Sequence, residues 1–561
     1  MDGNWTAALV PSSTEAAAFD EHFVTLPRFM RFLYTMRRMA LLRSAATVGG
    51  YTMASRVLGF IRDLLTAAFL GAGPMADAFF VAQRLPNLFR SLFAEGAFSA
   101  AFVPLFAGMI AHDGKPHAKR FAEDAMAVLL AVLFGFVVIG EFATPWLLDI
   151  LAPGFRADPA KFTLTVGLTR ITFPYLLFIS LTALQGGILN SVERFAATAA
   201  TPMLLNIFLI AALVFVRPIS GAALAWALSL SGFAQFLWLM VSCHQAGLSL
   251  SLPVPRLTPE VKRMLRLMLP GVFGAGVTQL NLVVSTAVAS LLPTGAVSYL
   301  YYADRLNQLP LAVVGIAVGT AILPSLARQL RLGDENGARH TQNRGLELAL
   351  FLTLPAAVGL GVAAWPIMTV LFQRGAFGPT EANATAAALA AYAAGLPAFV
   401  LIKVMTPGFF ARHDTATPVR IAVVAMGTNL ILTLLLGLAL PFGHVGVATA
   451  TSVAGWVNAL SLMVVLHRRG HFSLDERSRR VVPRILAAAL GMGVVLWGAD
   501  QACAPFFAGQ FLTRTLALVL ALGFGAAIFG VLAVLTGAAQ WREIAARLAL
   551  TGRPQGGDKS A

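Results

Sequence analysis

The chain has 561 residues, of which 58% are hydrophobic and 12% are charged, and its mean hydropathy is +0.76. A soluble domain carries about 25% charged residues, so this composition excludes an ordinary soluble enzyme, and the abundance of large apolar residues excludes a disordered chain. The formal net charge is +15, which is typical either of nucleic-acid binding or of basic cytoplasmic loops in a membrane protein.

The first 43 residues, 1–43, contain no clean apolar segment. They mix Phe and Met with several Arg residues, a pattern that does not match a cleaved signal peptide. We expect either a cytoplasmic arm at the membrane interface or a true translation start at Met36 or Met39.

Fourteen apolar stretches follow this arm. Each is long enough to cross a bilayer as a helix, which needs about 20 predominantly apolar residues, and their unbroken apolar runs favour helices over the alternating strands of a membrane barrel. We expect helices at residues 44–72, 75–111, 121–146, 162–190, 197–216, 220–243, 264–291, 295–327, 345–372, 382–411, 419–440, 445–466, 482–501 and 512–538.

The connections between these stretches alternate in basic content. Lys and Arg gather before the first stretch, in the even-numbered connections and in the tail at 541–561, whereas the odd-numbered connections carry few. The positive-inside rule then places both termini in the cytoplasm of a multi-pass inner-membrane protein. The net charge is therefore a topology signal, and no nucleic-acid partner is expected.

The two halves of the chain resemble each other at a shift of about 221 residues. The matching positions are 82–85 with 303–306, Pro145 with Pro366, Phe155 with Phe377, Pro174 with Pro397, and Asn206 with Asn429. This shift spans six helices, an even number, so both halves enter the membrane in the same direction. We expect two parallel six-helix lobes, 44–246 and 258–468, around a central cavity, with two extra helices within 478–540.

Ionisable side chains lie deep within the first, second and eighth stretches. A charge in mid-bilayer costs about 2.5–3.5 kcal/mol, so these groups should face a wet cavity or a partner. The candidate cavity residues are the cations Arg56, Arg62, Arg90 and Arg305, with Arg84 as a secondary candidate, and the carboxylates Asp77, Asp304 and Glu95. Arginine suits planar, bidentate recognition of phosphate, so an excess of arginine predicts an anionic, phosphorylated cargo.

Helical spacing divides these candidates. Residues seven apart share one face of a helix, so Asp77 can pair with Arg84, and Arg56 with Asp63. The other arginines have no such partner in their own helices, which leaves at least two cations in excess in the cavity. The alternative is that some of the arginines extend to the cytoplasmic rim or hold helices together.

Other polar residues give weaker signals. Lys403 and Arg170 are lone charges, for which we expect rim or packing positions. The sequence contains no carboxylate cluster for a coupling cation and no G-x-x-x-x-G-K-[ST] phosphate-binding loop. We therefore expect no metal and no cofactor. The membrane potential or an ion gradient should drive the cycle, because moving one charge through 100 mV is worth about 2.3 kcal/mol.

Several segments closely resemble the MurJ (MviN) family of lipid II flippases, over roughly residues 40–540. The segments are 55–63 (SRVLGFIRD), 76–80 (ADAFF), 85–90 (LPNLFR), 93–99 (FAEGAFS), 301–305 (YYADR), 323–326 (LPSL), 371–375 (LFQRG) and 407–410 (PGFF). The resemblance implies an all-α polytopic membrane protein with fourteen transmembrane helices, from the multidrug/oligosaccharidyl-lipid/polysaccharide exporter superfamily.

The resemblance also implies a function. It implies a flippase, and not an enzyme, that moves undecaprenyl-pyrophosphate-linked peptidoglycan precursor to the periplasmic leaflet for cell-wall synthesis. The family's cavity arginines match Arg56, Arg62, Arg90 and Arg305, and a family cavity carboxylate matches Asp77. Helices 13 and 14 would form a groove for the lipid tail. We expect a monomer in contact with membrane lipids, and the cell-wall synthesis machinery is a further expected partner.

Three other functions are open at this point. Another exporter of the same superfamily, for a polysaccharide lipid or for cationic drugs, is the nearest, although a site for cationic drugs should be acidic. An intramembrane glycosyltransferase or phosphatase would need a metal motif or a nucleophile–base pair beside a large loop, and the loops here are short. A scaffold of the cell-wall machinery would tolerate neutralisation of the cavity charges.

Overall fold

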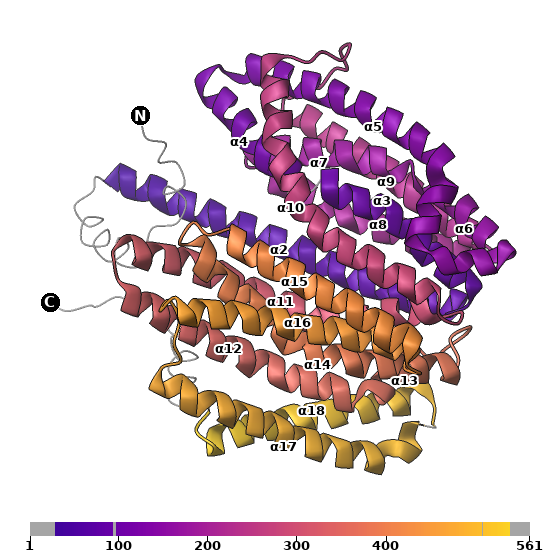
Figure 1. Ribbon diagram of the computed structural model, residues 1–561. Coiled ribbons are helices and arrows are strands. Elements are labelled where there is room, and N and C mark those ends of the chain that lie inside the picture. Colours follow the sequence, from indigo (N-terminus) through magenta and orange to yellow (C-terminus); the bar gives the residue numbers. More distant parts are fainter. Residues whose placement is uncertain (1–27, 94–96, 508, 539–561) are drawn as a thin grey trace.

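The computed structural model describes residues 28–93, 97–507 and 509–538 (Figure 1). The described chain is helical and forms no β-strand within these ranges. Its helices are α2 (Arg28–Leu70), α3 (Pro74–Phe93), α4 (Ala97–His112), α5 (Lys115–Leu151), α6 (Pro159–Thr172), α7 (Tyr175–Ser191), α8 (Phe195–Phe215), α9 (Gly221–Gln245), α10 (Pro259–Ser290), α11 (Ala296–Arg331), α12 (Glu335–Val362), α13 (Ala364–Leu371), α14 (Pro379–Phe410), α15 (Ala416–Leu434), α16 (Gly443–Arg468), α17 (Glu476–Phe507) and α18 (Phe511–Leu535), with short turns η1 (Pro153–Ala157) and η2 (Leu435–Ala439).

Each expected stretch coincides with one of these helices or with a consecutive pair of elements. The second, fourth and ninth stretches are each divided into two helices, α3 and α4, α6 and α7, and α12 and α13. Pro174 and Pro366 lie at two of the divisions, where a missing backbone N–H interrupts the helical hydrogen bonds. Ten helical segments within the described ranges are long and apolar enough to cross a membrane, which is compatible with the expected fourteen spans.

The first helix differs from its expected bounds. It begins at Arg28 rather than at residue 44, so part of the expected arm continues the first helix. Residues 1–27 and the tail at 541–561 lie outside the described residues.

Short polar side chains fix where several helices begin. Ser220 accepts a hydrogen bond from the Ala223 N–H at 3.2 Å, and Asp334 accepts one from the Gly337 N–H at 2.8 Å. Both satisfy backbone donors that have no partner in the first turn of a helix. Ser220 and Asp334 therefore fix the start of α9 and of α12.

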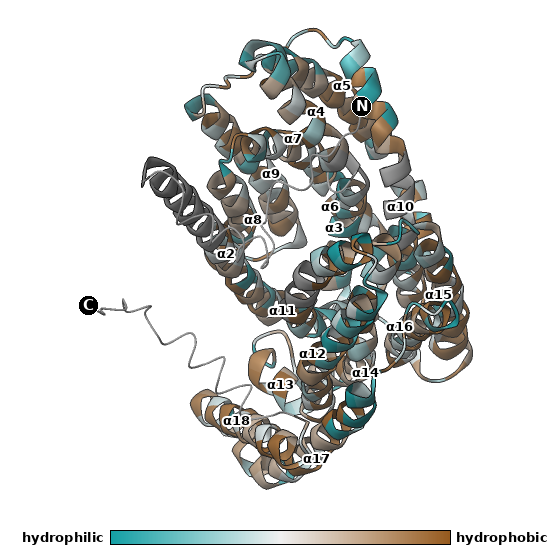
Figure 2. Ribbon diagram, turned by 90° about the vertical axis from the view of Figure 1, so that its left-hand side faces the viewer, coloured by the Kyte–Doolittle hydropathy of each residue, from teal (hydrophilic) through white to brown (hydrophobic). Residues whose placement is uncertain are grey.

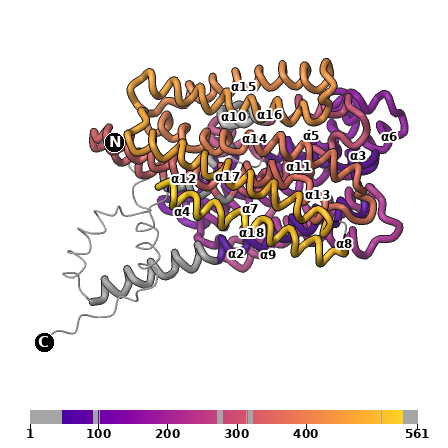
Figure 3. The backbone as a smooth tube through the Cα atoms, turned by 90° about the horizontal axis from the view of Figure 1, so that it is seen from below, coloured from indigo at the N-terminus to yellow at the C-terminus, as the bar shows by residue number. Residues whose placement is uncertain are grey.

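The helices form two groups (Figure 1). Helices α4, α5, α7 and α9 gather on one side, and α12, α14 and α16 gather on the other. Seen from below, the helices lie beside one another along a common direction (Figure 3). Helix α10 bridges the groups, because Val261, Met264 and Met268 pack in a core cluster with α4 and α5, while its second half contacts α15.

A buried asparagine makes a corresponding contact in each half. Asn206 on α8 donates a hydrogen bond to the Ser55 carbonyl on α2 at 3.0 Å. Its counterpart in the repeat, Asn429 on α15, donates to Asn281 Oδ1 on α10 at 2.6 Å. In both halves, therefore, the fifth helix of the repeat binds the first, and the repeat seen in the sequence is also a repeat of contacts.

The two halves meet where α3 crosses α11. Phe80 stacks on Tyr301 with ring centroids 3.9 Å apart and an interplanar angle of 19°, and these residues are separated by the repeat shift of 221. Asp77 and Ser298, separated by the same shift, are hydrogen-bonded. Because equivalent positions meet each other, a pseudo-twofold axis passes between α3 and α11.

Contacts between the halves concentrate at one end of the molecule, which we call the closed end. There the Ala376 N–H donates to the Ala68 carbonyl at 2.8 Å, and the Gly154 N–H donates to Ser290 Oγ at 3.0 Å. Gly375 has a φ of +60°, and a Cβ at this position would lie 2.1 Å from the Ala68 oxygen, so only glycine allows the two backbones to approach. The largest core cluster lies here and includes residues from both halves.

Helices α17 and α18 lie at the outer edge, beside α12. Ile485, Met492 and Phe529 form a small core cluster with Phe351 and Val358. Figure 2 shows α18 and much of α17 in the colour of hydrophobic residues, and many of their large apolar side chains are exposed. An exposed apolar face of this kind is expected of helices that face lipid.

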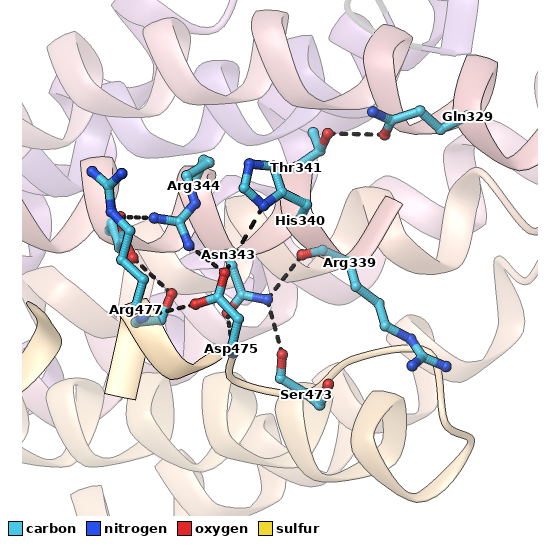
Figure 4. A network of polar contacts seen from close by, with 11 residues as sticks. Gln329, Arg339, His340, Thr341, Asn343, Arg344, Ser473, Asp475 and Arg477 are labelled. Carbon is cyan, nitrogen blue, oxygen red and sulfur yellow. Dashed lines mark hydrogen bonds and ion pairs between the residues drawn. The ribbon is translucent and has the colours of Figure 1, made fainter. Parts of the chain in front are cut away.

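A polar network joins α12 to the start of α17 (Figure 4). Arg344 pairs with Glu347 at 2.6 Å and with Asp475, and Ser478 Oγ donates to Glu347 at 2.8 Å. Partial burial tends to raise the pKa of Asp475, but hydrogen bonds from Ser478 and Arg344 outweigh it and hold this pKa below its usual range. The network fixes the two extra helices to the second lobe.

Candidate functional site

A cavity of about 520 Å³ lies between the two lobes, within the size range of small-ligand sites. One helix of the first lobe, α2, forms part of its wall, and α11, α14 and α16 of the second lobe form the rest. The lining side chains with polar atoms are Arg56, Arg62, Asp63, Asp304, Arg305, Asn307, Gln308, Tyr392, Lys403 and Thr451.

The charges of the cavity are unbalanced. Four cationic side chains and two carboxylates line it, a formal excess of two positive charges. Three of the cations, Arg56, Arg62 and Arg305, are candidates that the sequence singles out, and Asp304 is one of the carboxylates. Within apolar surroundings such an excess attracts an anion more strongly than it would in water.

Asp63 joins two of these arginines from opposite lobes. Its carboxylate lies 2.7 Å from Arg62 Nη2 and 3.8 Å from Arg305 Nε, and it accepts a hydrogen bond from the Tyr301 hydroxyl at 3.3 Å. Asp63 is buried, with 6% of its side chain exposed, whereas 38% of the Arg305 side chain is exposed. The sequence expectation that Asp63 pairs with Arg56 is therefore wrong, because its partners are its chain neighbour and a residue of another helix.

Arg62 is held more tightly than Arg305. Besides Asp63, it donates through Nη1 to Asn206 Oδ1 at 3.0 Å, so the asparagine that joins α8 to α2 also orients this guanidinium. The guanidinium carbon of Arg305 lies 4.7 Å from the centre of the Tyr301 ring, a distance typical of a cation–π contact. Both arginines are therefore pre-positioned before any ligand binds.

The other two cations of the cavity differ from this pair. Arg56 and Lys403 make no hydrogen bond or ion pair with any residue in the described ranges, and both are exposed into the cavity. Asp304 accepts a hydrogen bond from Gln308, its neighbour one turn away. Among the described residues, therefore, no carboxylate neutralises Arg56 or Lys403.

Arg84 occupies the position of Arg305 in the other half of the repeat. It donates to Thr286 Oγ1 on α10, so it reaches the first helix of the opposite lobe, as Arg305 does. It is not among the side chains that line the cavity. The expected pair of Arg84 with Asp77 is wrong, because both groups are used in contacts between helices.

Asp77 lies at the closed end and not in the cavity. It is buried and pairs with Lys161 Nζ at 2.8 Å. It also accepts hydrogen bonds from the Gly295 N–H at 2.8 Å and from the Ser298 N–H at 3.0 Å, and thereby satisfies free donors at the start of α11. The expectation of a cavity carboxylate at this position is not met in this conformation, whereas a gating position fits its contacts across the lobes.

The last two candidates are Arg90 and Glu95. Arg90 is half-buried in the last turn of α3 and is not among the cavity-lining residues. Glu95 lies outside the described residues.

Sequence reasoning expected Lys403 at a rim or packing position, whereas Lys403 lines the cavity, and it assigned no role to Lys161. Both carry a signal that was present in the sequence: Lys403 is a lone charge within the apolar run of α14, and Lys161 is a cation in an otherwise cation-poor odd-numbered connection. Their partners could not be found by spacing within one helix. No group of His, Cys, Asp and Glu in the described part of the chain could hold a metal ion.

Two repeated helical lobes around a cationic cavity, in close contact with each other at the closed end, define a membrane transporter of the alternating-access class. The sequence model of the family described as "Lipid II flippase MurJ" matches residues 66–517. A probable lipid II flippase MurJ of Rhizobium tropici is 44% identical over 89% of this chain and 95% of its own length. That of Rhizobium meliloti (strain 1021) is 48% identical over 82% of this chain and 86% of its own length.

Solved structures agree with these relatives. A structure of lipid II flippase MurJ in an inward closed conformation has a TM-score of 0.72 and 27% identity, and it covers 86% of this chain and 98% of its own. A multidrug MATE transporter in an inward-facing conformation has a TM-score of 0.64 at 14% identity over 76% of this chain and 98% of its own, which shows a shared fold. The chain belongs to the lipid II flippase MurJ family. It is a multi-pass membrane transporter and not an enzyme.

Proposed function

We propose that this chain carries lipid II from the cytoplasmic to the periplasmic leaflet of the bacterial inner membrane, for peptidoglycan synthesis, by alternating access of its two lobes. The observation that carries this proposal is the cationic excess of the cavity. Each phosphate of a diphosphate linked at both ends keeps one ionised oxygen, and the cavity offers a formal excess of two positive charges. The same excess disfavours a cationic drug as the cargo.

The distribution of basic residues supports an orientation. The positive-inside rule places the N-terminal end of α2 and both chain termini in the cytoplasm. Helix α2 then ends in the periplasm, so the closed end faces the periplasm and the cavity is accessible from the cytoplasm. In this state the cavity would receive lipid II from the leaflet in which it is made.

The remaining parts of the proposal concern the lipid tail and the driving force. The exposed apolar side chains of α17 and α18 suit a groove that holds an undecaprenyl chain while the headgroup occupies the cavity. Surrounding membrane lipids would complete this groove, and a monomer suffices because both lobes lie in one chain. We propose that the membrane potential or an ion gradient, with no cofactor, resets the lobes.

Complementation tests this function. A bacterium depleted of its own lipid II flippase should grow when it expresses this chain. Arg56→Ala, Arg62→Ala and Arg305→Ala should each abolish rescue at normal membrane expression, because each removes a cation from the cavity wall. Arg90 belongs to the segment 85–90 that resembles the family, but it does not line the cavity in this conformation. Loss of rescue by Arg90→Ala would indicate that Arg90 contributes to transport in another conformation.

A matched control is Arg420→Ala on α15, an exposed arginine that does not line the cavity, which should rescue growth as the wild type does. Failure of the wild-type chain to rescue, or rescue by all three cavity variants, would contradict the proposal.

A further inference from the structure

Lys403 is one of the two cavity cations for which the described part of the chain supplies no partner. It lies on α14 (Pro379–Phe410), its side chain is exposed, and it lines the cavity. No residue in the described ranges forms an ion pair or hydrogen bond with it. A charge in an apolar helix is costly, and a cation that stabilises no neighbour has no evident role in holding the fold together.

The repeat shows that the fold does not require a cation at this position. At the shift of 223 that relates Pro174 to Pro397, the counterpart of Lys403 in the first lobe is Ser180 on α7, which is small, neutral and buried. The scaffold therefore accommodates either residue. The positive charge is a property of the cavity side of the second lobe.

The position of Lys403 along its helix is also informative. Helix α14 starts at the closed end, directly after the turn that contacts Ala68, and Lys403 is 24 residues further on, about seven turns. Arg56 is about two turns before Asp63 on α2, which ends at the closed end. Both unpaired cations therefore lie on the side of the Asp63–Arg305 pair that is away from the closed end.

We propose, on the basis of the function above, that Lys403 is a substrate-binding residue of the second lobe. Together with Arg56 of the first lobe it binds the diphosphate of the incoming lipid, while Arg62 and Arg305 are still held by Asp63. A flexible lysine, with a compact charge and three rotatable donors, suits an anion that changes its position during transport. The two free cations belong to different lobes, so the bound diphosphate links them.

Binding to the full-length protein in phosphatidylcholine nanodiscs tests this proposal. The probes are lipid II and undecaprenol, which has the same tail but no phosphate. Lys403→Gln should weaken lipid II binding about tenfold, the usual loss for one hydrogen bond to a charged group. Lys403→Arg should retain most of the affinity, and undecaprenol binding should not change. The matched control is Lys262→Gln on α10, an exposed lysine outside the cavity, which should bind lipid II as the wild type does.

The outcomes separate the two proposals. If the wild-type protein does not bind lipid II, the proposed function fails. If it binds lipid II and Lys403→Gln binds equally well, only the role of Lys403 is overturned.

A second measurement needs no variant. In the wild-type protein, lipid II should protect Lys403 from reductive methylation, measured by mass spectrometry, and undecaprenol should not. Equal methylation of Lys403 with and without lipid II would overturn the role even if Lys403→Gln failed to fold.

Discussion

Arginine residues of one cavity have different physical roles. Arg62 and Arg305 share Asp63, so part of their charge is already used to join α2 to α11. Arg56 has no partner in the described ranges and contributes its full charge to the cavity. Cavity substitutions should therefore separate into those that affect folding and those that affect only transport.

This separation predicts a difference in stability. Asp63→Ala should lower the free energy of unfolding by about 1–3 kcal/mol, because it removes the carboxylate that forms ion pairs with both guanidinium groups. Arg56→Ala should change it by less than about 0.5 kcal/mol, although transport is lost. Thermal unfolding of the purified proteins measures the difference, with wild type and Arg420→Ala as references. An equal loss of stability in Asp63→Ala and Arg56→Ala would contradict the assignment.

At the scale of elements, the hydrophobic stretches predicted the helices, and proline positions explain where some of them divide. The candidate site was only partly predictable. Arg56, Arg62 and Arg305 could be found because charges in apolar stretches need a cavity or a partner. The partners of Asp63 and Asp77 could not be found, because they lie on other helices and spacing within one helix carries no information about neighbours across the bundle.

The closed end depends on one buried ion pair between elements. Asp77 and Lys161 have side chains only 1% and 6% exposed, and Asp77 also accepts hydrogen bonds from the first turn of α11. Asp77→Asn leaves the Lys161 charge buried without compensation, which typically costs about 3–5 kcal/mol. We expect lower thermal stability and a more accessible closed end, measured as faster labelling of a cysteine at the buried Ala72 (A72C) by a water-soluble maleimide.

A double variant that removes both charges is the control for the Asp77–Lys161 ion pair. The double variant Asp77→Asn with Lys161→Met removes both charges, and it should regain part of the stability that Asp77→Asn loses. If the double variant is as unstable as the sum of the two single variants, Asp77 and Lys161 are not coupled, and the closed end is held by its other contacts.

The repeat divides the whole molecule into two lobes of similar architecture that run through the membrane in the same direction. Equivalent positions meet at the pseudo-twofold axis, as Phe80 and Tyr301 do, so the two lobes can rock against each other as rigid bodies around the cavity between them. The halves differ in the partner of the equivalent arginine. Arg305 forms an ion pair with Asp63, whereas Arg84 donates a hydrogen bond to the neutral Thr286. The common architecture of the two lobes allows them to move against each other, and the excess of cations gives the cavity its preference for an anion.

If transport requires the lobes to separate at the closed end, linking them there must stop it. Ala68 and Ala376 are joined by a 2.8 Å backbone hydrogen bond between the lobes. In a background with Cys243 and Cys503 replaced by Ala, A68C with A376C should be cross-linked by a bifunctional methanethiosulfonate. Lipid II transport into proteoliposomes should then cease and return after reduction, because closure prevents release on the second side. A68C alone, treated identically, should keep its transport. Undiminished transport by fully cross-linked protein would show that the cargo leaves without opening this end, and alternating access would have to be abandoned for this chain.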